Sequence, residues 1–149
     1  MTIRCEIVSQ DRTVFQGDVD IVLLPGTAGE MGILPDHAPL LTLLKYGVIK
    51  IRKDGAERLF AVSGGMAEVQ PDIVTILADA AENIEEIDVV RAQAAKKRAE
   101  DALAKISPDE QPDVYLNMEA ALRRSNLRLD VVRRYRRVRD SYSEQDSSM

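Results

Sequence analysis

The residues best suited to hold a charged ligand are the arginines near the C-terminus of this 149-residue chain. All eight cations between residues 113 and 139 are arginine, and three acids accompany them. Arg124 and Arg128 are four residues apart, which places both side chains on one face of a helix. A guanidinium is always charged and presents planar donors that suit a phosphate. The sequence has no glycine-rich phosphate loop, so the pattern does not predict a hydrolytic nucleotide site.

Few residues in the chain could perform catalysis. There is one cysteine, Cys5, and one histidine, His37. One thiol forms neither an internal disulfide nor a thiolate metal cluster, and one histidine excludes a multi-histidine metal site. We therefore expect no catalytic residue, no metal and no required cofactor. Composition favours a binding or regulatory protein in a reducing compartment, with Cys5 packed as a small hydrophobe in the core.

The segment 87–92, IDVVRA, reads as the start of a helix. Asp88 is suited to be the N-cap, because its carboxylate can accept hydrogen bonds from the first free backbone N–H groups. Arg91 could then pair with a nearby acid such as Glu86. On the residues alone, this capped helix start is the simplest interpretation of the segment.

The first 80 residues predict strands. Ile3, Cys5 and Ile7 alternate with polar residues, as in a half-buried strand, and the pattern repeats at 19–23. Asp54-Gly55 predicts a two-residue hairpin. Further short strands fit the ranges 40–44, 48–53, 57–62, 66–70 and 73–77. Many short strands with close turns are typical of a sandwich or a barrel.

After Glu82 the apolar period changes to that of helices. Between residues 88 and 106 one helical face is formed by Ala92, Ala95, Ala99, Ala102 and Ile106. The break at 107–112 predicts a second helix that starts at Pro112 and runs to about Arg139. Its apolar stripe consists of Tyr115, Met118, Leu122, Ser125, Leu129 and Val132. So short a linker predicts an antiparallel helical hairpin.

The predicted fold class is therefore α+β, with an N-terminal antiparallel β-sandwich at 1–84 and a C-terminal antiparallel α-helical hairpin at 85–139. Residues 140–149 form a polar tail that we expect to be disordered. The net charge is −5, whereas residues 113–139 carry eight cations and three acids, or +5. This asymmetry suggests a partner for the basic helix, and the small core of a two-helix hairpin suggests a movable element.

Three stretches make the sequence resemble the epsilon subunit of the rotary F-type ATP synthase. They are LLPGTAGEMGILPDHAPLLTLLKYGVIKI at 23–51, FAVSGGMAEVQPDIVTILADAAENIEEID at 60–88, and IDVVRA at 87–92 followed by a basic helix. The resemblance implies a ten-stranded sandwich bound to the gamma subunit and the membrane c-ring. It also implies a non-catalytic subunit whose hairpin moves between a folded position and an extended one that inhibits ATP hydrolysis.

The resemblance also implies roles for particular residues. The IDVVRA segment resembles an ATP-binding motif, and the implied site comprises Glu82, Ile87, Asp88, Arg91, Ala92, Arg98, Arg124 and Arg128. ATP is then a regulatory ligand. The loop 29–32 reads, on residues alone, as a glycine-rich turn with an exposed acid. The resemblance instead implies that Glu30 and His37 contact the c-ring. Contacts with acidic faces of the catalytic beta and alpha subunits are implied for Arg123, Arg133, Arg134, Arg136 and Arg137.

A nucleic-acid-binding adaptor that uses the arginine-rich helix is the alternative. Against it, the rest of the chain is acidic, and aromatic residues for base stacking make up 4% of the sequence. The sequence has no apolar run of the roughly 18 residues that a membrane span needs, and no secretory signal. The resemblance implies a peripheral protein on the cytoplasmic face of a bacterial inner membrane, or on the stromal side of a thylakoid.

Overall fold

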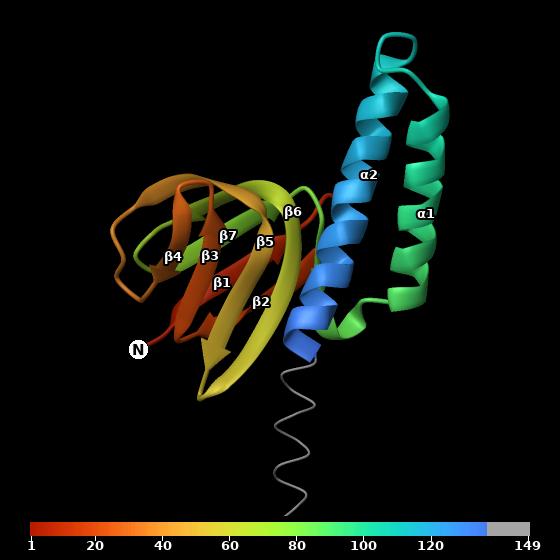
Figure 1. Ribbon diagram of the computed structural model, residues 1–149. Helices are drawn as coiled ribbons and strands as arrows, with labels where there is room; N and C mark the ends of the chain where they lie inside the picture. The colour runs from red at the N-terminus through yellow and green to blue at the C-terminus, as the bar shows by residue number, and fades with distance from the viewer. Residues whose placement is uncertain (137–149) are drawn as a thin grey trace, which may run out of the picture. The chain divides into compact units, whose positions relative to one another are not determined.

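The structure, a computed structural model, describes residues 1–136 of the chain (Figure 1). Arg137, Arg139 and the predicted tail at 140–149 lie outside the described residues. The chain divides into two units, Met1–Ile84 and Glu85–Met149. Strands make up the first unit and the long helices belong to the second, so the α+β fold class is confirmed.

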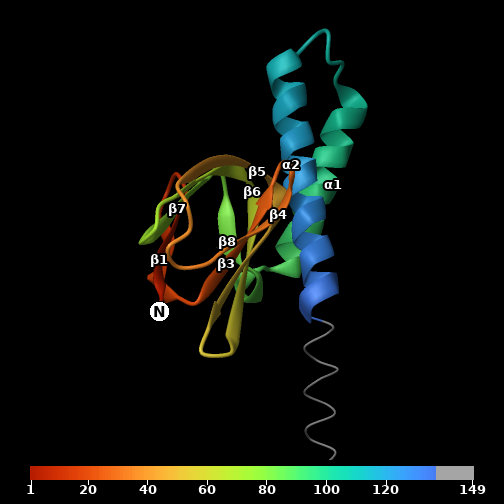
Figure 2. The same ribbon diagram turned by 90° about the vertical axis from the view of Figure 1, so that its left-hand side faces the viewer.

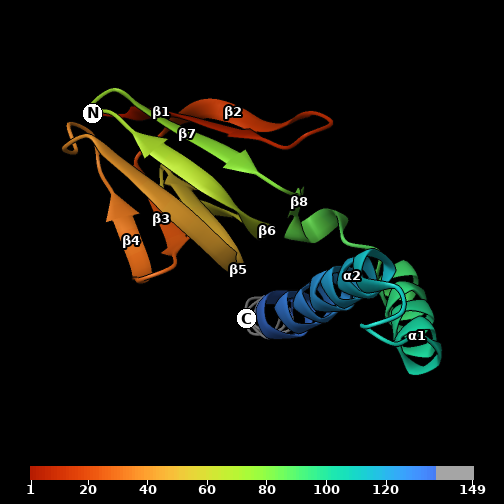
Figure 3. The same cartoon turned by 90° about the horizontal axis from the view of Figure 1, so that it is seen from above.

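The strands of the first unit form one sheet that folds over on itself into two layers (Figures 1 and 3). Their order is β2-β1-β7-β6-β5-β3-β4, and β8 pairs with β6. The strands are β1 (Ile3–Val8), β2 (Thr13–Val19), β3 (Ile21–Gly26), β4 (Gly29–Ile33), β5 (Leu40–Lys53), β6 (Ala56–Val69), β7 (Ile73–Ala78) and β8 (Ala81–Asn83).

The alternation predicted for the first strand is confirmed. Ile3, Cys5 and Ile7 of β1 are buried in an apolar core together with residues such as Leu24 and Phe60 from other strands. Burial raises the pKa of the Cys5 thiol to about 12, and the neighbouring charge of Glu6 adds to the effect. The single cysteine therefore packs as an unreactive apolar group.

Strands β5 and β6 each run through a break that the sequence predicts. The two strands pair along their whole length, including Leu44 with Gly65 and Tyr46 with Ser63 on the two sides of the bend. Gly64 and Gly65 have φ angles of +83° and +133°, which residues with a Cβ rarely adopt. This glycine pair therefore bends a continuous strand, where the sequence predicts a turn between two strands.

Two further features of the sheet differ from the prediction. The resemblance implies ten strands, whereas residues 1–84 contain eight, because β5 and β6 are each continuous. The pairing is also not wholly antiparallel, since β1 runs parallel to β7 with Cys5 opposite Val74. The hairpin at Asp54-Gly55 is confirmed: φ is positive at both residues, as a two-residue turn of the I′ type requires, and Lys53 faces Ala56.

The second unit contains two antiparallel helices, α1 (Val89–Lys105) and α2 (Pro112–Val131), after a short 3₁₀ turn η1 (Ile84–Glu86). Pro112 lies in the first turn of α2, where its missing N–H costs nothing. The α-helix predicted to reach Arg139 instead changes at Val132 into a π-helix, η2 (Val132–Arg136).

Gly65 is the position where an added methyl group should do most damage. A Cβ there would collide with the Leu77 carbonyl oxygen and stand 2.8 Å from the Ala78 Cα. We expect Gly65→Ala to lower the free energy of unfolding by more than about 3 kcal/mol, measured by urea denaturation. Gly29→Ala is the matched control, because Gly29 has a similar φ of +139° and no neighbouring atom within 4 Å. Equal losses in the two variants would show that backbone strain alone governs both positions.

Candidate functional site

The two helices of the second unit meet through small side chains. Ala92 and Ala99 of α1 are buried, and so are Ser125 and Val131 of α2. The Ser125 hydroxyl donates to the Ala121 carbonyl oxygen of its own helix at 2.9 Å, so the buried oxygen is satisfied. Figures 1 and 2 show the helices side by side. Small residues at three of the four buried positions permit this close approach.

The start of α1 is fixed by Asp88. Its carboxylate Oδ1 accepts a hydrogen bond from the Arg91 backbone N–H at 3.1 Å, and its carbonyl accepts one from Ala92 at 3.0 Å. The predicted N-cap is thus present. Among the contacts of residues 1–136, no ion pair joins Arg91 to Glu86. Ile87, the residue before the cap, is buried.

Four of the arginines predicted to bind ATP lie on one side of the hairpin. Arg91 and Arg98 are seven residues apart on α1, and Arg124 and Arg128 are four apart on α2, so each pair shares a helix face. Because the helices are antiparallel, the level of Arg91 on α1 corresponds to the C-terminal part of α2. We call this surface the arginine side; its members are Arg91, Arg98, Arg124 and Arg128.

A groove of about 770 Å³ lies on the other side of the hairpin. Gln93 and Asn126 line it, and they follow Arg91 and Arg124 by two residues, which is roughly 200° around each helix. The groove is therefore separate from the arginine side. Its full lining is Val89, Gln93, Lys96, Asn126, Leu127, Leu129, Asp130, Val132 and Arg133.

The arginines at the end of α2 have different surroundings. Arg133 and Arg134 are exposed, and both pair with Asp130, at 2.9 and 3.3 Å. Arg136 is half-buried, and its Nη2 donates to the Ile87 carbonyl oxygen at 2.9 Å. Arg123 is exposed on α2, and Arg137 lies outside the described residues.

The remaining predicted site residues belong to the first unit. Glu82 lies on β8 opposite Ala61 of β6. Glu30 is exposed on β4. His37 follows β4 and places its Nδ1 2.8 Å from the Ala38 carbonyl oxygen. The histidine therefore has a local backbone partner.

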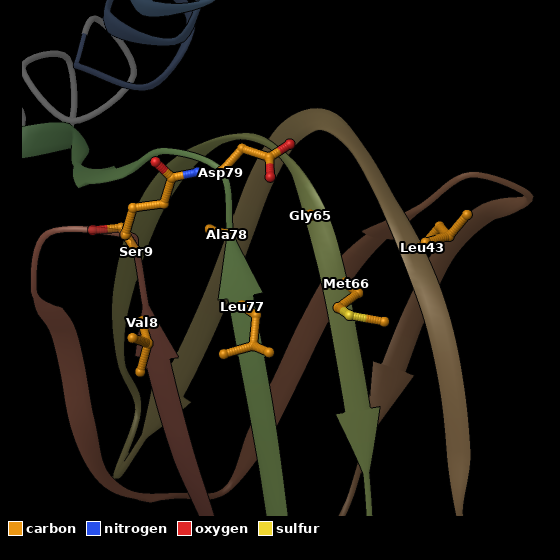
Figure 4. Close-up of a pocket in the computed structure, with 9 residues that line it drawn as sticks. Val8, Ser9, Leu43, Gly65, Met66, Leu77, Ala78 and Asp79 are labelled. Atoms are coloured by element: carbon orange, nitrogen blue, oxygen red, sulfur yellow. The ribbon is translucent and has the colours of Figure 1, made fainter.

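One surface feature of the first unit is not predicted by the sequence. Val8, Leu77, Met66 and Leu43 occupy consecutive positions across four adjacent strands, β1, β7, β6 and β5. All four line a groove of about 500 Å³ (Figure 4), and Leu43 and Leu77 are 61% and 51% exposed. We call these four residues the apolar row. Its sequence signal was weak, because runs such as LLTLL at 40–44 are apolar on both faces of the strand.

The described residues offer binding surfaces and no catalytic cluster. Residues 1–136 contain no group of three His, Cys, Asp or Glu side chains that could hold a metal ion. No described helix combines the length and apolar character needed to cross a membrane. Guanidinium groups on one side of a hairpin can bind an anion through charged hydrogen bonds.

Comparison with known protein families gives the class. The model for the beta-sandwich domain of the ATP synthase Delta/Epsilon chain matches residues 2–84, and the model for the long alpha-helix domain matches residues 85–133. The chain therefore belongs to the ATP synthase delta/epsilon chain family.

Individual relatives narrow this class. An ATP synthase epsilon chain from Bacillus licheniformis is 47% identical over 132 residues, covering 89% of this chain and 98% of the relative. One from Dehalococcoides mccartyi is 46% identical over 141 residues, covering 91% and 95%. A chain in a cryo-EM structure of Euglena gracilis mitochondrial ATP synthase, containing OSCP, F1 and the c-ring, is 29% identical with a TM-score of 0.64, covering 81% of this chain and 75% of that one. The predicted class, a non-catalytic epsilon-type subunit rather than an enzyme, is confirmed.

Proposed function

We propose that this epsilon-type subunit couples the gamma subunit to the c-ring through its sandwich and inhibits ATP hydrolysis through its hairpin. The observation that carries the proposal is that three of the four residues buried on α1 and α2, namely Ala92, Ala99 and Ser125, are small, whereas Val131 is the one larger side chain. Small side chains bury little apolar surface, so we take the closed hairpin to be an element of low stability that a partner or ligand can shift. We place the protein at the periphery of the membrane, on the cytoplasmic or stromal side.

The apolar row is the surface we assign to the gamma subunit. Exposed apolar side chains that lie in contiguous register across four strands mark a protein interface more often than scattered ones do. Glu30 and His37 lie on or just after β4, outside the apolar row, and supply polar groups for the c-ring loops. One domain could then contact both partners through separate surfaces.

The arginine side is the surface we assign to the triphosphate of ATP. It draws on both helices, so a bound phosphate chain would hold them together and favour the closed hairpin by mass action. Asp88 fixes the backbone at the start of α1 beside Arg91, and Glu82 stays a site residue predicted by resemblance. ATP acts here as a regulatory ligand and is not hydrolysed by this subunit.

In the extended state the basic end of α2 contacts acidic faces of the catalytic beta and alpha subunits. Charge complementarity would steer and orient that contact. Arg133 and Arg134 share one internal acid, Asp130, so the local net charge stays positive. Arg123 and Arg136 add to it. An extended hairpin held in this way blocks rotation in the hydrolysis direction.

The first prediction concerns gamma docking. Leu77→Glu or Met66→Glu places a charge in the apolar row, and we expect the affinity for gamma to fall about 30-fold or more in a calorimetric titration. Leu34→Glu is the control, because Leu34 is 56% exposed in the same unit and lies outside the groove. A gamma affinity unchanged by both substitutions in the row would place the interface elsewhere.

The second prediction concerns inhibition. Removing residues 88–149 should leave the sandwich and its partners assembled and should raise ATP hydrolysis by the complete enzyme. The reason is that the only part removed is the one proposed to block rotation. The measurement is the hydrolysis rate of reconstituted enzyme under conditions where the full-length chain inhibits. An unchanged rate would mean that the hairpin does not inhibit.

The third prediction concerns nucleotide binding. Losing one charged hydrogen bond costs about 1.5–3 kcal/mol, so Arg91→Ala or Arg128→Ala should weaken ATP binding roughly 10- to 100-fold. Arg133→Ala removes the same charge from the groove on the other side of the hairpin and should change the affinity little. Calorimetry on the isolated chain makes the comparison. Equal effects of all three substitutions would indicate nonspecific attraction, and no binding at millimolar ATP would remove the site.

A further inference from the structure

The hairpin has one covalently closed end and one open end. Residues 106–111 join α1 to α2 at the closed end. At the open end α1 begins and η2 finishes, and here the Arg136 Nη2 donates to the Ile87 carbonyl oxygen at 2.9 Å. Ile87 is buried and Arg136 is half-buried. A charged donor thus joins the two chain segments that must separate when the helices part.

The π-helix η2 accounts for the direction of this contact. Val132 caps α2 with its N–H shared between the Arg128 and Leu129 carbonyl oxygens, and the chain then continues in wider turns to Arg136. A wider turn changes which way the following side chains point, and such turns recur at functional positions. Arg133 and Arg134 pair with Asp130 in the preceding turn, whereas Arg136 bonds across to the start of α1.

We infer that Arg136 is a latch: its hydrogen bond to the Ile87 carbonyl oxygen holds the open end of the hairpin closed. The acceptor is a main-chain oxygen, so the contact depends on where the backbone before α1 lies and not on the side chain at position 87. Loss of one charged hydrogen bond shifts an equilibrium roughly 10- to 100-fold, a large effect for a hairpin whose buried residues are mostly small. Arg136 is therefore a positioning residue of the closed state.

The latch also relates the nucleotide contact to the contact with the acidic partner, a consequence that rests on the proposed function: the first favours the closed hairpin and the second the extended one. Ile87 and Asp88 are consecutive, so a nucleotide at the start of α1 and the latch stabilise the same turn in the same direction. When the hairpin extends, the Arg136 guanidinium leaves Ile87 and becomes available to the acidic partner. One side chain then contributes to the closed state or to the extended one.

The test is native-state hydrogen exchange of the full chain, read by NMR without nucleotide or partner. The reporters are the amides of Ala92, bonded to Asp88, and Val132, bonded to Arg128 and Leu129, both near the open end. The Tyr115 amide, bonded to Gln111, reports the closed end. Arg136→Gln should speed exchange of both reporters roughly 10- to 100-fold and leave Tyr115 unchanged. Arg134→Gln, the charge-matched control on η2, should leave all three nearly unchanged.

Two results would overturn the latch. One is equal exchange in Arg136→Gln and Arg134→Gln, which would mean that only the net charge matters. The other is faster exchange at Tyr115 as well, which would mean that the whole hairpin is destabilised. Arg136→Lys keeps the charge and a donor, and should restore part of the protection. A further arm keeps the two proposals apart: faster exchange at the open end in Arg136→Gln, together with an unchanged hydrolysis rate after removal of residues 88–149, supports the latch and contradicts the inhibitory role of the hairpin.

Discussion

The stability of the second unit depends on the contact between α1 and α2. Most of the residues buried on the two helices are small: Ala92, Ala99 and Ser125 bury little apolar surface, and Val131 is the one larger buried side chain. A contact of this kind contributes less free energy than one made by leucine and isoleucine throughout. Single polar contacts at the hairpin, such as the Asp88 cap and the Arg136 hydrogen bond, therefore weigh more here than they would beside a large apolar core.

The first unit is built on the opposite principle. Its core is continuous and mainly aliphatic, with isoleucine, valine and leucine from β1, β3, β5, β6 and β7 buried together with Phe60. Because these large side chains are closely packed, the layers of the sandwich cannot separate as readily as the two helices can. This difference supports the proposed function, in which the sandwich carries the partner surfaces and the hairpin carries the regulation.

Many features of the two units can be predicted from the sequence because they depend on local patterns of residues. The alternation of Ile3, Cys5 and Ile7 and the positive-φ turn at Asp54-Gly55 need no tertiary information. The helix cap at Asp88 is equally local. The sequence predicts separate strands at 57–62 and 66–70, whereas β6 continues through a bend at Gly64-Gly65. A glycine pair permits either a turn or a bend, and only pairing with β5 decides between them. The parallel pairing of β1 with β7 joins residues about 70 apart in sequence and has no local signal.

The candidate sites divide in the same way. The sharing of helix faces by Arg124 and Arg128 follows from spacing. The apolar row does not, because it exists only when four strands take their register. The Arg136 contact requires a π-helix, which no spacing rule predicts. Features that lie within one helix or strand are therefore predictable here, whereas features that require contacts between several helices or strands are not.

The buried thiol of Cys5 makes the stability of the sandwich respond to alkaline conditions. Its pKa of about 12 in the folded chain compares with 9.0 for an exposed thiol. Between these values the unfolded chain gives up its proton while the folded chain keeps it, so the free energy of unfolding falls as the pH rises through 9. At neutral pH both forms hold the proton and this contribution vanishes. A lone sulfur atom buried on β1 thus lowers the stability of the sandwich under alkaline conditions.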